Sequence, residues 1–378
     1  MPPAQQLAAR SLALAHSHEV SARADRSRPP ARHLRSRSLN THTYIVGIDI
    51  GGTANKFTVI DGHGEYLIDH LVELPSRVTE GPKIAISAMR QAFDSALQLA
   101  GVNPHNVRGV GLDTPGPASA NGVLSSRGAT NFSDPEWHGF DVRAALEDEL
   151  GVPVVYNNDG NAAALYAHHR HFGPVAGERS SVAAIVGTGL GGGVIESGRI
   201  IKGAAGMAGE LGHVHIPMHG LLLEGQPLPR CNCGFSGDAE SVASLSGIRN
   251  NLLPFWLTQY PDHPLGRLDP LEAAKQMRTY GEHGDEMARR LFDQQAMALG
   301  RLFTIAANFT DPDAYFIGGG VIEAAPEFRD WFRDRVVQHT QLRDEQQRVA
   351  KFELVADLDM AGARGAAIAA LSVIVHDI

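Results

Sequence analysis

Residues 44–60, YIVGIDIGGTANKFTVI, decide the fold class. An alternating apolar stretch stops at Gly51-Gly52-Thr53 and then resumes, which predicts two antiparallel strands around a glycine turn. The run 65–74 predicts a third strand of the same meander. At the turn, glycines let backbone N–H groups approach an anion, Thr53 adds a hydroxyl donor, and Asp49 can hold a hydrated divalent cation. An ordinary hairpin turn is the alternative interpretation.

Residues 181–201 repeat this plan. A strand at 181–186 ends in GTGLGGG at 187–193, and two strands flank a turn at 197–198. Five glycines in seven residues are costly in chain entropy, so the segment predicts backbone contacts to phosphate, with a flexible loop as the alternative. No Lys follows the glycines and a strand comes next, which argues against a P-loop and a dinucleotide-binding turn. The recurrence indicates an internal duplication of a phosphate-cradling hairpin.

Hydrophobic spacing predicts further helices and strands around the two hairpins. We expect helices at 81–100, 141–150, 161–171, 271–310 and 361–375. We expect strands at 107–112, 152–156 and 315–317, the last entering a run of three glycines at 318–320.

Length and composition indicate a globular chain of about two domains. Of the 378 residues 43% are hydrophobic and 20% charged, which rules out global disorder. The two cysteines are one residue apart, which excludes a disulfide-rich secreted scaffold. The late apolar stretch 365–375 is too short to span a bilayer, so we expect no membrane association and a cytoplasmic location.

Charge is divided unevenly along the chain. Residues 1–40 carry seven Arg and two acidic residues, a net charge of +5, which leaves −14 for the remainder. The acidic body has no reason to favour nucleic acid, and we expect no such partner. We interpret the basic head as a disordered tail or as an artefact of an assumed translation start. An organelle transit peptide and a nucleic-acid arm are the alternatives.

Two further clusters carry candidate chemistry. In NNDGN at 157–161, Asp159 can orient and deprotonate a hydroxyl, although an Asn/Asp turn that caps the next helix is the alternative. In GELGH at 209–213, Glu210 and His213 offer the carboxylate and imidazole that suit sugar hydroxyls. The CNC sequence at 231–233 can join a histidine in a structural zinc site, and free thiols are the alternative.

These motifs, taken in order, closely resemble the ROK family (repressors, open reading frames, kinases) of the actin-like, hexokinase-like ATPase superfamily. The resemblance runs from about residue 45 to 375. The matching strings are GIDIGGT at 47–53, TPGP at 114–117, NNDGNAAA at 157–164, GTGLGGG at 187–193, GELGH at 209–213, CNCGFSG at 231–237 and IGGG at 317–320.

The resemblance implies an α/β, two-domain actin-like (ribonuclease H-like) ATPase fold with a cleft between the lobes. It places a disordered basic head at 1–43, a small α/β domain at 44–157 plus 362–378, and a large α/β domain at 158–361. It implies an ATP-dependent kinase that phosphorylates the 6-hydroxyl of a hexose with Mg²⁺, as in glycolysis and carbohydrate metabolism. We expect glucose as the acceptor and a homodimer, for which we expect an exposed apolar surface at 291–309.

Residue by residue, the resemblance assigns Asp159 as the general base. The sugar contacts are Asn131, Asn158, Glu210, His213 and Glu240. The nucleotide and phosphate contacts are Asp49, Gly51, Gly52, Thr53, Thr188, Gly189, Gly319 and Gly320. The ligands of a structural Zn²⁺ are His213, Cys231, Cys233 and Asp238. Asp238 stands where the family usually has a third Cys, and His215 or His219 are alternative ligands.

Other outcomes remain open. N-acetylmannosamine, N-acetylglucosamine, mannose and fructose are alternative acceptors, and polyphosphate is an alternative donor. A sugar-responsive transcriptional repressor requires an N-terminal helix-turn-helix, and the residues before the first strand lack two amphipathic helices. A non-catalytic actin-like scaffold is a further alternative, against which the cluster around Asp159 argues.

Overall fold

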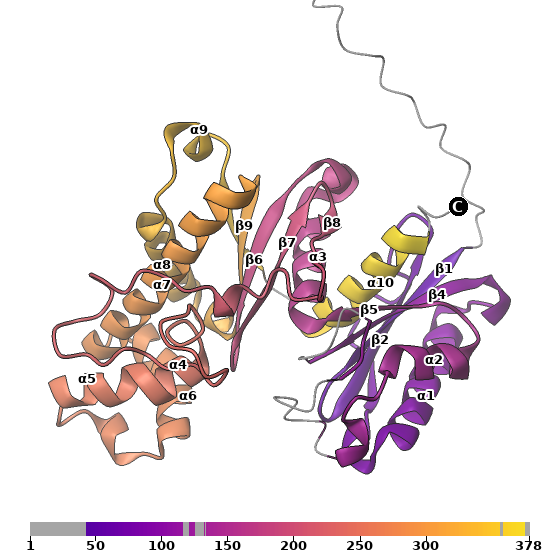
Figure 1. The fold of residues 1–378 in the computed structure, drawn as a ribbon, viewed down its shortest axis with the longest axis horizontal. Coiled ribbons are helices and arrows are strands. Elements are labelled where there is room, and N and C mark those ends of the chain that lie inside the picture. The colour runs from indigo at the N-terminus through magenta and orange to yellow at the C-terminus, as the bar shows by residue number, and fades with distance from the viewer. Residues whose placement is uncertain (1–42, 116–120, 125–131, 133, 356–357, 375–378) are drawn as a thin grey trace, which may run out of the picture. The chain divides into compact units, whose positions relative to one another are not determined.

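The computed structural model describes residues 43–115, 121–124, 132, 134–355 and 358–374. Two five-stranded sheets organise these residues, with strand orders β3-β2-β1-β4-β5 and β10-β9-β6-β7-β8 (Figure 1). The strands are β1 (Tyr44–Ile50), β2 (Ala54–Asp61), β3 (Glu73–Pro75), β4 (Val107–Thr114), β5 (Val154–Asn158), β6 (Ser181–Val186), β7 (Leu190–Glu196), β8 (Arg199–Ile200), β9 (Ala314–Gly319) and β10 (Lys351–Val355). The helices are α1 (Pro82–Ala100), α2 (Val142–Leu150), α3 (Asp159–Phe172), α4 (Leu245–Gly247), α5 (Leu253–Gln259), α6 (Pro270–Glu282), α7 (Glu286–Thr310), α8 (Pro326–His339), α9 (Asp344–Gln347) and α10 (Ala361–Ile374).

The two sheets share one plan. In the first, β1 pairs antiparallel with β2 and parallel with β4, which in turn pairs parallel with β5. In the second, β6 pairs antiparallel with β7 and parallel with β9, which pairs parallel with β10. The internal duplication predicted from the two glycine turns is therefore confirmed as a duplication of the whole strand arrangement.

Helices α3 and α10 lie between the two sheets (Figure 1). Small residues permit this close packing, since the buried face of α10 consists of alanine and glycine with one isoleucine. A Cβ on Gly47 of β1 would lie 1.9 Å from the carbonyl oxygen of Ala363 in α10. A Cβ on Gly365 of α10 would lie 1.8 Å from the carbonyl oxygen of Ala162 in α3. Glycine at both positions thus lets α10 pack closely against β1 on one side and against α3 on the other.

The outer faces of the sheets are covered by separate hydrophobic cores. Helices α1 and α2 pack on the first sheet, around Met89, Phe93 and the fully buried Trp137. Helices α6, α7 and α8 pack on the second sheet. The expectation of an exposed apolar surface at 291–309 is wrong, because most apolar residues of α7 face this core. Phe309, which is 84% exposed, is an exception. The homodimer stays a prediction without that support.

Most of the expected elements are found within a few residues of their predicted bounds. The third strand is the main exception, because β3 spans three residues and not the run 65–74. Exposed polar residues such as Asp69 and His70 interrupt the run. The part of the run before β3 lies outside the sheet, except for an isolated bridge between Ile60 and Tyr66. The second glycine segment also differs, since residues 190–193 belong to β7 and the turn itself is shorter than expected.

Residues 40–378 form one compact unit, so the division into domains at 157/158 and 361/362 stays a prediction. Among the helices described here, none has both the length and the apolar character needed to cross a bilayer. The residues assigned to the basic head lie outside the described residues, except for Thr43.

Candidate active site

The junction of β5 and α3 carries the predicted general base. Asn158 ends β5, and its side-chain oxygen accepts a hydrogen bond from the amide of Asn161 at 2.7 Å, so the predicted helix cap is real. Asp159 begins α3, and its Oδ1 accepts from the amide of Gly160 at 2.8 Å. Because Asn158 does the capping, the carboxylate of Asp159 remains accessible at the edge of the sheet. The surrounding protein removes much of the water around the carboxylate of Asp159 and so raises its pKa, and the hydrogen bond from the Gly160 amide opposes that shift.

A row of polar residues crosses the first sheet beside Asp159. Asp49 of β1 pairs with Lys56 of β2 on one side and with Asp113 of β4 on the other, and Asp113 pairs with Asn157 of β5. Directly paired residues point to the same face of a sheet, so all four side chains lie on the face covered by α10. Sequence reasoning found Asp49 but missed Asp113, although both are carboxylates at the ends of apolar strands.

Burial makes these carboxylates hard to ionise. It raises the pKa of Asp49 to about 6; Lys56 counteracts the shift and Asp159 adds to it. Burial also raises the pKa of Asp113 well above its usual value, with further contributions from Asp49 and Asp159. Asp159 therefore acts on both Asp49 and Asp113, and Asp49 acts on Asp113 as well.

The two glycine turns lie at the ends of the central hairpins. In the first, the amide of Gly51 bonds to the carbonyl of Ala54 at 2.8 Å, which leaves Thr53 exposed at the turn. In the second, the amide of Gly187 bonds to the carbonyl of Gly189 at 2.9 Å, with Thr188 exposed at the turn. Both turns thus present a threonine hydroxyl with adjacent backbone, as the sequence predicted.

The glycines of β7 have a packing role as well. A Cβ on Gly160 of α3 would lie 2.6 Å from the amide nitrogen of Gly192. A Cβ on Gly193 would lie 2.9 Å from the Cβ of Ala164. The start of α3, which carries Asp159, can therefore rest directly on β7, and this contact explains part of the glycine run without phosphate.

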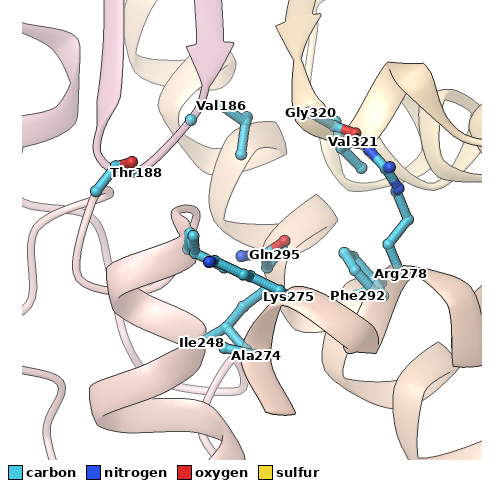
Figure 2. A pocket seen from close by; sticks show the side chains of 12 residues that line it. Val186, Thr188, Ile248, Ala274, Lys275, Arg278, Phe292, Gln295, Gly320 and Val321 are labelled. Atoms are coloured by element: carbon cyan, nitrogen blue, oxygen red, sulfur yellow. Dashed lines mark hydrogen bonds between the residues drawn. The ribbon is translucent and has the colours of Figure 1, made fainter. Parts of the chain in front are cut away.

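A cavity of about 350 Å³ opens beside the second glycine turn (Figure 2). Its lining is Val186, Gly187, Thr188, Leu245, Ile248, Ala274, Lys275, Arg278, Phe292, Gln295, Gly320 and Val321. The structure thus brings Thr188 and Gly320 together at one cavity. Gly319, the residue before Gly320, has a φ of 91°, a backbone conformation that favours glycine. Arg278 Nη1 donates to the carbonyl of Gly320, which fixes the guanidinium at the rim.

Gln295 gives this apolar cavity a defined polar group. Its Nε2 donates to the carbonyls of Val242 at 3.0 Å and Ser244 at 3.2 Å, so both amide hydrogens are used. No described residue donates to its Oε1. An acceptor of fixed position therefore remains for a ligand. Sequence reasoning missed Gln295, whose only signal is a glutamine pair within an apolar helical run.

The predicted sugar contacts are only partly gathered. Asn158 Nδ2 donates to Glu210 Oε1 at 3.0 Å, which joins two of them. Burial raises the pKa of Glu210, while His213 opposes the shift. Glu240 is engaged elsewhere, since its Oε2 accepts from the amide of Leu190 at 2.8 Å. Asn131 lies outside the described residues.

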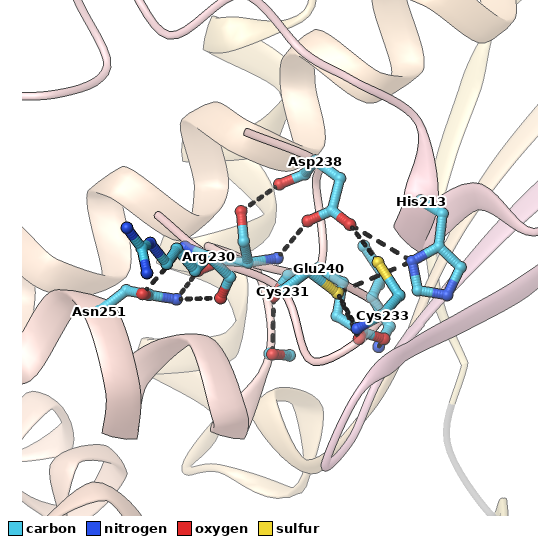
Figure 3. Close-up of polar contacts among 10 residues, drawn as sticks. His213, Arg230, Cys231, Cys233, Asp238, Glu240 and Asn251 are labelled. Atoms are coloured by element: carbon cyan, nitrogen blue, oxygen red, sulfur yellow. Dashed lines mark hydrogen bonds and ion pairs between the residues drawn. The ribbon is translucent and has the colours of Figure 1, made fainter. Parts of the chain in front are cut away.

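The four predicted metal ligands meet in one cluster (Figure 3). The ligand atoms of His213, Cys231, Cys233 and Asp238 all lie within 4.8 Å of one another. His213 Nδ1 lies 3.3 Å from Asp238 Oδ2 and 3.8 Å from the sulfur of Cys231. Neither alternative histidine takes part in this cluster, and the ring of His215 lies against Phe235 instead.

Two further contacts tie this cluster to the rest of the site. The thiol of Cys231 donates to Glu240 Oε1 at 3.2 Å, and the other oxygen of Glu240 holds the amide of Leu190 next to the second glycine turn. Burial raises the pKa of Cys231. Burial acts to raise the pKa of Asp238 too, but hydrogen bonds from Ser241 and His213 help to outweigh it and hold that pKa below its usual value.

Known proteins resemble this chain in sequence and in fold. A glucokinase of Halalkalibacterium halodurans is 31% identical over 74% of this chain and 81% of its own length. An N-acetyl-D-glucosamine kinase of Escherichia coli is 31% identical over 85% of this chain and 97% of its own length. The crystal structure of a ROK family glucokinase from Streptomyces griseus, in complex with glucose and AMPPNP, has a TM-score of 0.60, with 26% identity over 86% of this chain and 98% of that one. Residues 45–373 match the sequence model of the ROK family, and the chain belongs to that family.

Proposed function

We propose that the chain is an ATP-dependent hexose kinase that phosphorylates the 6-hydroxyl of glucose. The observation that carries the proposal is the place of Asp159. Asp159 directly follows Asn158, whose side chain is hydrogen-bonded to Glu210. The accessible carboxylate of Asp159 is also close enough to Asp49 to influence the pKa of Asp49. This carboxylate is thus next to the hydrogen-bonded pair of Asn158 and Glu210 and acts on Asp49, two residues before the first glycine turn.

In this proposal Asp159 is the general base. The raised pKa of its carboxylate makes it a stronger proton acceptor than an ordinary aspartate, and it accepts the proton of the sugar hydroxyl during attack on the phosphoryl group. Asn158 and Glu210 orient the sugar through its other hydroxyls. Phosphoryl transfer needs little covalent help from the protein, so positioning and charge stabilisation supply most of the rate.

The cavity beside the second glycine turn suits the nucleoside of ATP. Its apolar side chains can contact the base, Gln295 Oε1 can accept from the amino group of adenine, and Lys275 adds positive charge at the lining. The exposed turns at Thr53 and Thr188 would contact the phosphates through hydroxyl and backbone groups. The Streptomyces griseus relative, bound to glucose and AMPPNP, supports this pairing of donor and acceptor.

The donor groups also suit the two expected metals. The carboxylate of Asp49 at the first turn offers the oxygen ligands that Mg²⁺ prefers, and the bound ion would offset phosphate charge during transfer. Two thiols, an imidazole and a carboxylate match the donor types of structural zinc, with no open position in the set of four. We infer that zinc would brace the loop that carries His213 and Glu240.

A second acceptor is supported by one comparison. The Escherichia coli N-acetyl-D-glucosamine kinase is as similar in identity as the glucokinase and matches more of the chain. N-acetylmannosamine, mannose and fructose stay the other predicted acceptors. The second proposal is therefore a kinase for one of these sugars with the same general base.

A sugar and donor panel tests the proposal. Formation of the hexose phosphate should be measured with glucose and the four alternative hexoses, each with ATP and with polyphosphate. ADP release by a coupled assay follows the reactions in which ATP is the donor. The proposal expects hexose-dependent ADP release, with the highest kcat/KM for glucose. A higher value for another hexose would move the assignment to that sugar. ATP consumption that ignores every hexose would contradict the kinase proposal and favour a non-catalytic role.

A further inference from the structure

Asp113 is the least satisfied charged group of the described site. It is 0% exposed, and no described residue forms a hydrogen bond with either of its carboxylate oxygens. A buried carboxylate without partners costs several kcal/mol, so such a group calls for a compensating ligand. Nothing in the proposed transfer of a phosphoryl group uses Asp113.

The carboxylate of Asp113 points to the same place as that of Asp49. The two residues are direct partners in the parallel pair of β1 and β4. A Cβ built on Gly362, near the start of α10, would lie 2.6 Å from Asp49 Oδ2 and 2.8 Å from Asp113 Oδ2. Oxygens of both side chains therefore meet at one point between the sheet and the helix.

The groups around this point do not neutralise it. The charged side chains that act on Asp113 are Asp49, Asp159 and Lys56, which is one cation against three carboxylates. Lys56 is the paired neighbour of Asp49, yet among the described residues it forms no ion pair within 4.0 Å. Asn157, the neighbour of Asp113 on β5, is 2% exposed, and both polar atoms of its side chain also lack partners.

We propose that Asp113 and Asp49 form a divalent-cation site, with the side-chain oxygen of Asn157 as a further donor, which is occupied before the nucleotide binds. Several oxygen donors and a net negative charge are what Mg²⁺ and Mn²⁺ select, and the cation compensates the buried carboxylates. The role of the bound cation rests on the proposed function, because a cation next to Asp159 would contact the phosphates of the nucleotide where transfer occurs.

Titration of the full chain with Mn²⁺ tests the site, with free Mn²⁺ followed by its EPR signal in the absence of nucleotide and sugar. The matched variants are Asp113→Asn, which keeps the shape and removes the charge, and Asp148→Asn, which removes an exposed carboxylate on α2. We expect wild type and Asp148→Asn to bind Mn²⁺ alike. Asp113→Asn should bind it at least about ten-fold more weakly.

Thermal melting separates this proposal from a purely structural role. Without metal, Asp113→Asn should melt at a temperature no lower than that of wild type, because burial already disfavours the charged carboxylate and the amide has the same shape. The rise in melting temperature that Mn²⁺ gives to wild type should disappear in this variant. If Asp113→Asn does not fold, Asp113→Ser serves the same comparison with a smaller side chain.

Two results would overturn the proposal. Equal Mn²⁺ affinity in wild type and Asp113→Asn would identify Asp113 as a buried neutral carboxyl group, and so would a wild-type chain that binds no Mn²⁺ without nucleotide. Neither result depends on sugar phosphorylation, so a failure here is distinct from a failure of the hexose panel.

Discussion

Asn158 and Glu210 are separated by 52 positions in the sequence, yet Nδ2 of Asn158 donates to Oε1 of Glu210 at 3.0 Å. This bond connects the end of β5 to the loop that leads into the metal cluster. It places an amide and a carboxylate directly before Asp159 and defines the proposed sugar side of the site.

Glu210→Gln should weaken sugar binding. The amide oxygen can still accept from Asn158, but the charge that strengthens a hydrogen bond from a sugar hydroxyl is lost. We expect the KM for the hexose to rise by roughly ten-fold or more and the KM for ATP to stay unchanged. Steady-state kinetics with the preferred sugar measures both values. The exposed Glu224→Gln is the control, and a similar hexose KM in all three proteins would remove Glu210 from the sugar contacts.

Metal analysis of the purified chain tests the cluster of His213, Cys231, Cys233 and Asp238. We expect bound zinc in wild type, loss of zinc in Cys231→Ser, and a lower melting temperature both in that variant and after chelation. Asp238→Cys should retain zinc longer against a chelator, because a thiolate is a softer ligand than a carboxylate. Equal zinc contents of wild type and Cys231→Ser would refute the assignment.

Base selectivity tests the cavity next to the second glycine turn. Gln295 Oε1 can accept from the 6-amino group of adenine but would face a carbonyl oxygen in inosine. We expect ATP to exceed ITP in kcat/KM by at least about ten-fold, since polar groups left unpaired reject an analogue strongly. Gln295→Met should reduce that ratio toward one. If wild type used ATP and ITP equally well, Gln295 would have no part in base recognition.

Stability should fall on acidification through two histidines of α3. Burial lowers the pKa of His168, and burial together with His168 lowers the pKa of His169 to about 4. The neutral forms are favoured in the fold, so their stabilising contribution is complete above about pH 6.5 and is lost as the pH falls toward 4. For His169 the loss amounts to up to about 3 kcal/mol.

Urea denaturation at pH 7.5 and pH 5 measures this effect. His169→Gln should lose less stability between the two pH values than wild type does. The exposed His105→Gln, on the 3₁₀ turn before β4, is the control and should behave as wild type. If all three proteins lost the same stability, the acid sensitivity would have to arise elsewhere.

The sequence predicted most elements because their signals are local. Alternating apolar residues and glycine turns defined β1, β2, β6 and β7, helical spacing defined α1, and alanine-rich composition defined α10. Asp113 could not be found in this way. Its importance comes from lying beside Asp49, and the pairing of β1 with β4 depends on a strand order that no local pattern encodes.

Other parts of the site also depend on tertiary structure. The resemblance predicted the four residues of the metal cluster, and the structure brings them together. It assigned Glu240 to the sugar, whereas both oxygens of Glu240 already accept hydrogen bonds from Leu190 and Cys231. The sugar contact of Glu240 therefore stays a prediction. Gln295 resembles any polar residue of an amphipathic helix until the cavity beside it is known.

The Asp159→Asn variant provides the most direct test of the central claim, which is that this carboxylate accepts the proton of the sugar hydroxyl. Glucose binding should be measured by calorimetry and phosphoryl transfer by single-turnover kinetics with ATP. We predict glucose affinity close to that of wild type and a transfer rate lower by at least about three orders of magnitude, as expected for loss of a positioned general base. A variant that keeps a tenth of the wild-type rate would contradict the account.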